Sequence, residues 1–252
     1  MAATGGRAFS TRQYPCQQCP LRPLKVFRAF EPDELDYISR FKKGELAVEK
    51  GATVLVEGSH SAHLYTVLSG WGFRYKLISD GRRQILNYNM PGDLIGLQGS
   101  LLGEMQHSIE ALSPMLLCVF EREKLPELYR NYPGLAYDIT WIASREERML
   151  DENLLSIGRR TALERAAYLL AFLSERARSV SVTGKAVEIP VTQQHVADTL
   201  GLSLVHTNKT LRKLTDRKLI RWRDGGCSVL DLDGLKALSH WEGLGEGRRP
   251  LV

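Results

Sequence analysis

Cysteine thiols are the residues of this chain with the clearest capacity for chemistry. Cys16 and Cys19 form a Cys-x-x-Cys pair, Cys118 lies in the apolar run MLLCVF, and Cys227 has no cysteine near it. A close pair of thiols can bind a metal ion or switch reversibly between dithiol and disulfide. A free cysteine in an apolar run is commonly a buried packing residue. Both a metal or redox role and a structural role are therefore open for Cys16, Cys19 and Cys118, and Cys227 is expected to be structural.

Positive charge is concentrated between Gly158 and Gly226. This segment contains 13 lysines and arginines against 6 aspartates and glutamates, a net charge of +7, whereas the whole chain carries +5. The remaining residues therefore carry a net charge of −2. Basic charge gathered in one segment is typical of a domain that binds a polyanion, although it can also be a solvated basic face. The pattern of two helices at 191–214 makes double-stranded DNA the expected polyanion.

Within the basic segment, residues 191–214 have the pattern of two short helices joined by a tight turn. Thr192 can cap the first helix, and Ser203 can cap the second, which should run to about Asp216. Gly201 suits the left-handed conformation that ends a helix. The pattern predicts a helix-turn-helix, whose second helix would enter the major groove of DNA.

The second helix begins with two aliphatic side chains, which could contact thymine methyl groups, while Lys209 could bind a guanine. Polar residues around them suit phosphates and base edges. The predicted DNA-binding residues are Thr192, Gln193, Ser203, Leu204, Val205, His206, Thr207, Asn208, Lys209, Arg212 and Lys213.

A β-rich part and a long helix precede the basic segment. From Leu46 to Glu121, short apolar runs alternate with turn residues such as Asp80-Gly81, which predicts an antiparallel barrel or jelly roll. Residues 135–156 contain no glycine or proline and predict a long helix that Gly158 ends. An apolar stripe on this helix could pack against a second copy of the chain, as a dimerisation seam, or against its own barrel. The stripe consists of Leu135, Ile139, Ile142 and Met149.

The predicted fold class is α+β, with an N-terminal antiparallel β-barrel or jelly roll, a long dimerisation helix and a C-terminal winged helix-turn-helix. An amphipathic helix over 162–179 precedes the helix-turn-helix, and a wing around Gly225 leads to a last helix near 233–240. Residues 243–252 are expected to be frayed. The expected domains are a flexible Cys-x-x-Cys arm (1–25), a sensory barrel (26–133), a dimerisation helix (134–157), a winged helix-turn-helix (158–240) and a C-terminal tail (241–252).

The order of these elements, from about Val26 to His240, resembles that of the Crp/Fnr family of bacterial transcription regulators. The stretch GDLIGLQGSL at 92–101 is similar to the segment that lines the effector pocket of the family, and residues 191–214 are similar to its DNA-reading unit. The resemblance implies a cyclic-nucleotide-binding-like barrel, a homodimer, a two-fold symmetric DNA site and RNA polymerase as a further partner.

Two departures from the family pattern concern the effector. Members that bind cyclic nucleotides have Gly-Glu and Arg-Ser where this chain has Gly96-Leu97 and His107-Ser108. A leucine cannot accept a hydrogen bond from a ribose hydroxyl, and histidine is a poor substitute for a bidentate arginine. We therefore expect an effector other than cyclic AMP at the pocket formed by Gly96, Leu97, His107 and Ser108.

Oxygen-sensing members of the family hold an iron–sulfur cluster, and Cys16, Cys19 and Cys118 match three of its ligands. The remaining cysteine of the N-terminal cluster is missing from this chain. A [4Fe–4S] cluster normally takes four thiolates. The cofactor therefore stays unknown, and the alternatives are a cluster with a non-cysteine ligand, zinc or another metal, a thiol switch, or no metal.

Several classes of function are not expected. No apolar run approaches the roughly 20 residues of a membrane helix, and Met1–Arg12 lacks the apolar core of a signal peptide, so we expect a cytoplasmic protein. No catalytic triad, phosphate loop or carboxylate pair has a convincing context, so we expect no enzyme. The prediction is a homodimeric, sequence-specific DNA-binding transcription regulator, controlled by a signal at the barrel or the cysteine arm. The alternatives are a sensory module that regulates a partner protein without binding DNA, and a thiol oxidoreductase that works through Cys16 and Cys19.

Overall fold

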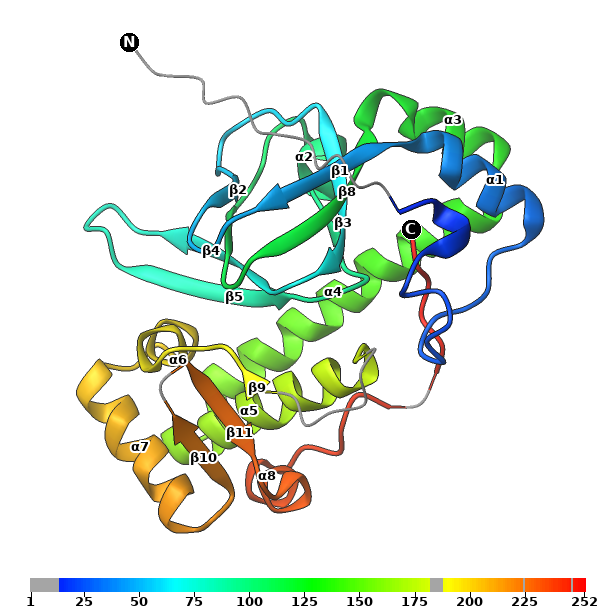
Figure 1. Ribbon diagram of the computed structural model, residues 1–252. Coiled ribbons are helices and arrows are strands. Elements are labelled where there is room, and N and C mark those ends of the chain that lie inside the picture. The colour runs from blue at the N-terminus through cyan, green and yellow to red at the C-terminus, as the bar shows by residue number, and fades with distance from the viewer. Residues whose placement is uncertain (1–13, 182–187, 224, 246) are drawn as a thin grey trace. The chain divides into compact units, whose positions relative to one another are not determined.

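The computed structural model describes residues 14–181, 188–223, 225–245 and 247–252, which form two compact units. The first unit comprises the described residues up to Gly72, with Asn89–Ile142 and Arg249–Val252. The second comprises Phe73–Tyr88 and the described part of Ala143–Arg248. The predicted α+β class is confirmed (Figure 1).

Antiparallel strands form two four-stranded sheets in the β-rich part of the chain. One sheet has the order β1-β8-β3-β6 and consists of β1 (Lys42–Val48), β8 (Met115–Glu121), β3 (His63–Ser69) and β6 (Leu94–Ile95). The other has the order β2-β7-β4-β5 and consists of β2 (Thr53–Leu55), β7 (Ser108–Ala111), β4 (Gly72–Leu77) and β5 (Arg83–Asn89). The turn between β4 and β5 is the predicted one at Asp80-Gly81, where Gly81 has a φ of 87°.

The alternation of side chains along β3 and β8 produces two cores. In the antiparallel register, Tyr65 pairs with Val119 and Leu64 pairs with Phe120. Successive residues of a strand point to opposite faces, so the two pairs are buried on different sides of the sheet. Tyr65 and Val119 belong to the core that β1, β2 and β7 share. Leu64 and Phe120 belong to a core completed by α1 (Pro32–Phe41), α3 (Leu125–Asn131) and the start of α4 (Pro133–Arg159).

Local sequence determines where the helices of the first unit begin. Pro32 occupies the first turn of α1, and the Glu34 carboxylate accepts a hydrogen bond from the Glu31 N–H at 2.9 Å. Gly96, with a φ of 95°, precedes α2 (Leu97–Leu102). Two single-turn helices, η1 (Cys16–Gln18) and η2 (Arg122–Lys124), complete this part of the chain.

The helix α4 is longer than predicted at both ends. Gly158 lies inside it, so the prediction that this glycine ends the helix is wrong. The Arg160 N–H still donates to the Ser156 carbonyl at 3.1 Å, which shows that helical hydrogen bonding continues past the glycine.

The apolar stripe of α4 packs within its own chain. Leu135 and Ile139 are 0% and 1% exposed and lie in the core with Phe120, against which Ile142 also packs. Met149 is 4% exposed. Leu135, Ile139 and Met149 are buried in their own chain and cannot contact a second copy, which corrects the dimerisation role predicted for them. Ile142 is half-buried, and its predicted role stays a prediction.

The second unit contains α5 (Ala162–Ser179) and α8 (Leu232–Ser239), which match the helices predicted near those positions. The N-cap Thr161 accepts a hydrogen bond from Glu164 at the start of α5, which explains why this helix begins at the predicted residue. Across the described residues, no helix is long and apolar enough to cross a membrane.

The segment 249–252 is not frayed, in contrast to the prediction. Arg249 forms a parallel bridge with Phe27. Its carbonyl accepts a hydrogen bond from the Arg28 N–H at 2.9 Å, and its own N–H donates to the Val26 carbonyl at 2.7 Å. The last residues therefore extend the N-terminal segment as an added strand-like pair, and Figure 1 shows them beside it.

In addition to these backbone hydrogen bonds, contacts of the Arg249 side chain hold this segment in place. The guanidinium of Arg249 lies 2.8 Å from Asp93 and donates to the Pro91 carbonyl at 2.7 Å. It also lies 4.6 Å from the centre of the Phe27 ring. The side chains of Arg249 and Asp93 are only 7% and 4% exposed, so the ion pair is buried. An isolated sequence cannot reveal this pair, because its members are 156 positions apart.

We predict that Arg249→Ala lowers the free energy of unfolding by about 3–5 kcal/mol, because it removes the guanidinium from a buried carboxylate. Urea unfolding followed by circular dichroism measures the change in the transition midpoint. Arg248→Ala is the matched control, since Arg248 is exposed and should give a change below about 0.5 kcal/mol. Equal losses in the two variants would contradict the role given to Arg249.

Candidate nucleic-acid interface

The first helix of the predicted helix-turn-helix is α6 (Gln193–Leu200). Its N-cap Thr192 accepts a hydrogen bond from the His195 N–H at 3.2 Å, and His195 Nδ1 accepts one from the Thr192 N–H at 3.1 Å. These bonds satisfy amide groups that the start of a helix leaves open. The helix ends at Gly201, whose φ of 65° is the predicted left-handed turn.

The second helix, α7 (Leu204–Asp216), follows its predicted bounds and has one buried and one exposed face. The Ser203 hydroxyl caps it by accepting a hydrogen bond from the His206 N–H at 3.3 Å. Spacings of three and four residues place Thr207, Thr210, Leu211 and Leu214 on the buried face. The exposed face contains Leu204, Val205, His206, Asn208, Lys209, Arg212 and Lys213.

Most of the predicted DNA-binding residues therefore lie at the surface, and their role in binding DNA stays a prediction. Thr192 and Ser203 are exposed and Gln193 is half-buried, each at the start of a helix. Thr207 is a correction, because it is 0% exposed and cannot reach a phosphate. Its hydroxyl has no hydrogen-bond partner among the described residues.

A three-stranded sheet completes the predicted winged helix-turn-helix. Its order is β10-β11-β9, with β10 (Ile220–Arg223), β11 (Gly226–Val229) and β9 (Glu188–Ile189). Arg221 and Arg223 on β10 are exposed and add positive charge near α7. Cys227 on β11 is 0% exposed, and burial raises the pKa of its thiol to about 12, which suits the expected structural role.

The strand β5 contributes the contacts that position α6 within the second unit. Arg83 lies 2.8 Å from the carboxylate of Asp198, and the Gln84 amide donates to the Thr199 carbonyl at 2.9 Å. The hydroxyls of Tyr88 and Thr199 are 2.8 Å apart, and burial raises the pKa of Tyr88. Sequence reasoning missed these residues, since Arg83 and Asp198 are 115 positions apart and no local pattern links them.

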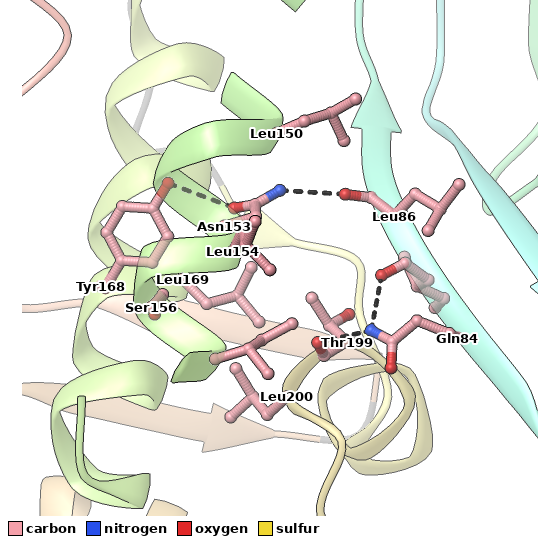
Figure 2. A pocket seen from close by; sticks show the side chains of 12 residues that line it. Gln84, Leu86, Leu150, Asn153, Leu154, Ser156, Tyr168, Leu169, Thr199 and Leu200 are labelled. Atoms are coloured by element: carbon pink, nitrogen blue, oxygen red, sulfur yellow. Dashed lines mark hydrogen bonds between the residues drawn. The ribbon is translucent and has the colours of Figure 1, made fainter. Parts of the chain in front are cut away.

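A small cavity beside these contacts is shown in Figure 2 and has a volume of about 160 Å³. Asn153 of α4 bridges two of its walls, because its amide donates to the Leu86 carbonyl at 2.9 Å and accepts from the Tyr168 hydroxyl at 3.2 Å. The Gln84–Thr199 bond closes a third side. β5, α4, α5 and α6 thus line one cavity, which the half-buried side chain of Asn153 bridges.

The four residues predicted for an effector pocket lie on neighbouring elements of the first unit. Gly96 and Leu97 stand at the start of α2, and His107 and Ser108 are 6% and 8% exposed. The Ser108 hydroxyl accepts a hydrogen bond from the Glu57 N–H at 3.0 Å, so it serves the fold. The structure places all four residues in the first unit, and their effector role stays a prediction.

The three cysteines proposed as metal ligands lie near a buried ion pair. The ammonium of Lys42 is 2.5 Å from Glu45, which is 0% exposed, and it interacts electrostatically with Cys16 and Cys118. Burial raises the pKa of the Cys118 thiol to about 12 and raises that of Cys16. Within the described part of the chain, no three His, Cys, Asp or Glu side chains gather as a metal site. These residues do not fit an iron–sulfur cluster or another metal as they stand.

The fold and the interface define a protein with an N-terminal β-rich domain and a C-terminal winged helix-turn-helix. Residues 45–132 match the cyclic nucleotide-binding domain family, and residues 164–238 match the Crp-like helix-turn-helix domain family. The chain is 30% identical to the nitrogen fixation regulation protein FixK of Bradyrhizobium diazoefficiens, over 89% of this chain and 93% of FixK. It is 26% identical to the transcriptional activator protein Anr of Pseudomonas protegens, over 90% and 93% of the two chains.

The solved structure of FixK2 from Bradyrhizobium japonicum has a similar fold, with a TM-score of 0.67 and 26% identity over 77% of this chain and 96% of that one. The chain belongs to the Crp/Fnr family of transcription regulators. It is a DNA-binding regulator and not an enzyme, so the thiol oxidoreductase alternative is not favoured.

We predict that Thr207→Val raises the free energy of unfolding by about 1 kcal/mol, because it replaces a buried hydroxyl that lacks a partner with a methyl group of similar size. Its affinity for DNA should be unchanged. Thr210→Val is the matched control on the same face. The Thr210 hydroxyl donates to the His206 carbonyl at 2.9 Å, so this variant should lose about 1 kcal/mol. Thermal unfolding and a gel-shift titration test both variants, and weaker DNA binding by Thr207→Val would restore the role first predicted for this residue.

Proposed function

We propose that the protein acts as a homodimer that binds a two-fold symmetric DNA site, with α7 of each copy in the major groove. The observation that carries this proposal is the exposure of two aliphatic side chains at the start of α7. Leu204 is 42% exposed and Val205 is 66% exposed, although both stand among cationic and amide side chains. Apolar groups at the floor of the groove suit the methyl group of thymine, which is the apolar feature of the major-groove edge.

The polar residues of α7 divide between bases and phosphates in this proposal. His206, Asn208 and Lys209 lie next to the aliphatic pair and would contact base edges. Arg212 and Lys213 lie one to two turns further along and would contact phosphates, as would Thr192 and Gln193 at the start of α6. This division gives sequence preference to the N-terminal turns of α7 and general affinity to the rest.

The surface of α4 supports a different dimerisation seam from the one the sequence predicts. Exposed residues recur at alternate spacings of three and four from Tyr137 to Leu154, which are 69% and 70% exposed. A large apolar side chain at each end of such a row suits a helix pair between two copies. The seam consists of Tyr137, Thr140, Ser144, Glu147, Asp151 and Leu154.

A signal at the β-rich domain or at the N-terminal arm would control DNA binding, and RNA polymerase is the expected further partner. The effector pocket is proposed at Gly96, Leu97, His107 and Ser108, with a ligand other than cyclic AMP. Leu97 and His107 support this exclusion, because neither side chain offers the ribose acceptor or the bidentate phosphate donor that a cyclic nucleotide needs. A regulator of chromosomal genes in a bacterium would work in the cytoplasm.

We predict that replacing the thymine opposite Val205 by uracil weakens binding roughly fourfold, which corresponds to one lost methyl contact. The half-site is first selected from random-sequence duplexes, and fluorescence anisotropy then measures affinity for duplexes with single uracils. Val205→Ala provides the matched control, since the same uracil should have no further effect on that variant. A selected half-site without thymine, or equal uracil effects on both proteins, would refute the methyl contact.

We predict that Leu154→Glu weakens dimerisation roughly tenfold or more, because it places two carboxylates against each other across the seam. Analytical ultracentrifugation at several concentrations measures the dissociation constant. Leu230→Glu is the matched control, because Leu230 is 47% exposed and lies after the wing, outside α4. A dimer of unchanged strength in Leu154→Glu would remove the proposed seam.

A further inference from the structure

A second, larger cavity lies in the second unit and has no role in DNA binding as described above. Its volume is about 430 Å³, within the range of small-molecule sites. Its walls come from α4, α5 and the segment that follows α8. The residues that matter for its chemistry are Arg148, Glu152, Arg160, Tyr168, Phe172 and Trp241.

Aromatic rings form one wall of this cavity. The ring centre of Trp241 lies 5.5 Å from that of Tyr168 and 6.0 Å from that of Phe172. Trp241 meets both rings edge to face, at 88° and 71°, whereas Tyr168 and Phe172 stack on each other with ring centres 5.7 Å apart. Trp241 is only half-buried although Tyr168 and Phe172 are buried, so part of the indole stays available to a ligand.

Arg160 supplies a buried hydrogen-bond donor at the same cavity. Its Nε donates to the Ser239 carbonyl at 2.8 Å, and its Nη2 lies 2.8 Å from the carboxylate of Glu152. Its guanidinium carbon lies 4.6 Å from the centre of the Tyr168 ring. The side chain is 10% exposed, and Nη1 has no hydrogen-bond partner among the described residues. A buried charged donor without a partner is costly, so an acceptor from a ligand would be favourable there.

Other charged groups around the cavity limit the ligand to a single negative charge. Arg148 stands at the rim and donates to the Leu244 carbonyl at 2.8 Å. The ammonium of Lys236 lies 5.7 Å from the centre of the Trp241 ring and 3.0 Å from Glu175. Glu152 and Glu242 line the cavity together with Arg148 and Arg160. A phosphate dianion would therefore meet two carboxylates, whereas one carboxylate can accept from Arg160 alone.

We propose that this cavity binds a flat aromatic carboxylate. The ring lies against Trp241 beside Tyr168, and the carboxylate accepts a hydrogen bond from Arg160 Nη1. The volume holds an acid of one or two fused rings. Because its walls join α4 to α5 and to the segment after α8, occupancy ties the proposed dimerisation helix to the helix that supports α7.

The test uses the full chain labelled with 5-fluorotryptophan and observed by fluorine NMR. Trp71, Trp141, Trp222 and Trp241 give four resonances, which single Trp→Phe variants assign. The probe is 1-naphthoate, and 1-naphthalenemethanol is the uncharged control with the same ring. We expect 1-naphthoate to shift the Trp241 resonance saturably and to leave Trp222, on the wing strand β10, unmoved.

Substitutions then separate binding from a change in folding. Arg160→Lys should weaken 1-naphthoate binding about tenfold or more, because lysine keeps the charge but cannot place a donor at the position of Nη1. Arg159→Lys is the matched control, since Arg159 is the exposed neighbour of the same charge. If Arg160→Lys unfolds, Tyr168→Ala replaces it and should abolish the Trp241 shift in a chain whose other three resonances keep their positions.

Three results would overturn the proposal. One is a Trp241 resonance that does not move at 1-naphthoate concentrations up to about 10 mM. A dissociation constant above that concentration would not indicate a specific site. Another is equal affinity for 1-naphthalenemethanol, which would leave Arg160 without a role. The last is unchanged affinity in folded Arg160→Lys. The titration contains no DNA and applies equally to monomer and dimer, so its failure is distinct from failure of the proposed DNA-binding mode.

Discussion

The helix-turn-helix depends on hydrogen bonds that reach it from β5. Arg83, Gln84 and Tyr88 bind two consecutive residues near the end of α6, Asp198 and Thr199. Gly201 follows at once, so these bonds fix the point from which the turn and α7 begin. A helix of eight residues is too short to be stable alone in water. The direction in which α7 presents its exposed face is therefore set by contacts outside the DNA-reading motif itself.

The helix α4 has one face that packs within the chain and one face that is exposed. Its N-terminal part buries Leu135 and Ile139 in the core of the first unit, and its C-terminal part provides Asn153, which bridges β5 and α5 in the second. Leu135, Ile139 and Asn153 contact the rest of the chain, whereas Tyr137 and Leu154 are exposed and available to another molecule.

Local patterns in the sequence were sufficient for the elements whose causes are local. The caps Thr192 and Ser203 and the left-handed Gly201 gave the bounds of α6 and α7. Predictions failed where the cause was a distant partner. The stripe through Leu135 had two possible neighbours, and periodicity cannot choose between them. Thr207 was assigned by residue type although its spacing from Leu211 already placed it on the buried face. The ion pair of Arg249 with Asp93 and the hydrogen bond from Gln84 to Thr199 each link residues more than 100 positions apart.

The N-terminal segment is bound to β1 at Tyr14 by two charged side chains, Glu45 and Lys42. The Tyr14 N–H donates to Glu45 at 2.7 Å, and Lys42 donates to the Tyr14 carbonyl at 2.7 Å. In the register of β1 and β8, Glu45 pairs with Cys118, so the ion pair and the half-buried Cys118 thiol share one surface of the sheet. Lys42 and Glu45 both lie on β1, so release of Tyr14 would leave their ion pair intact and would remove one hydrogen bond from each residue.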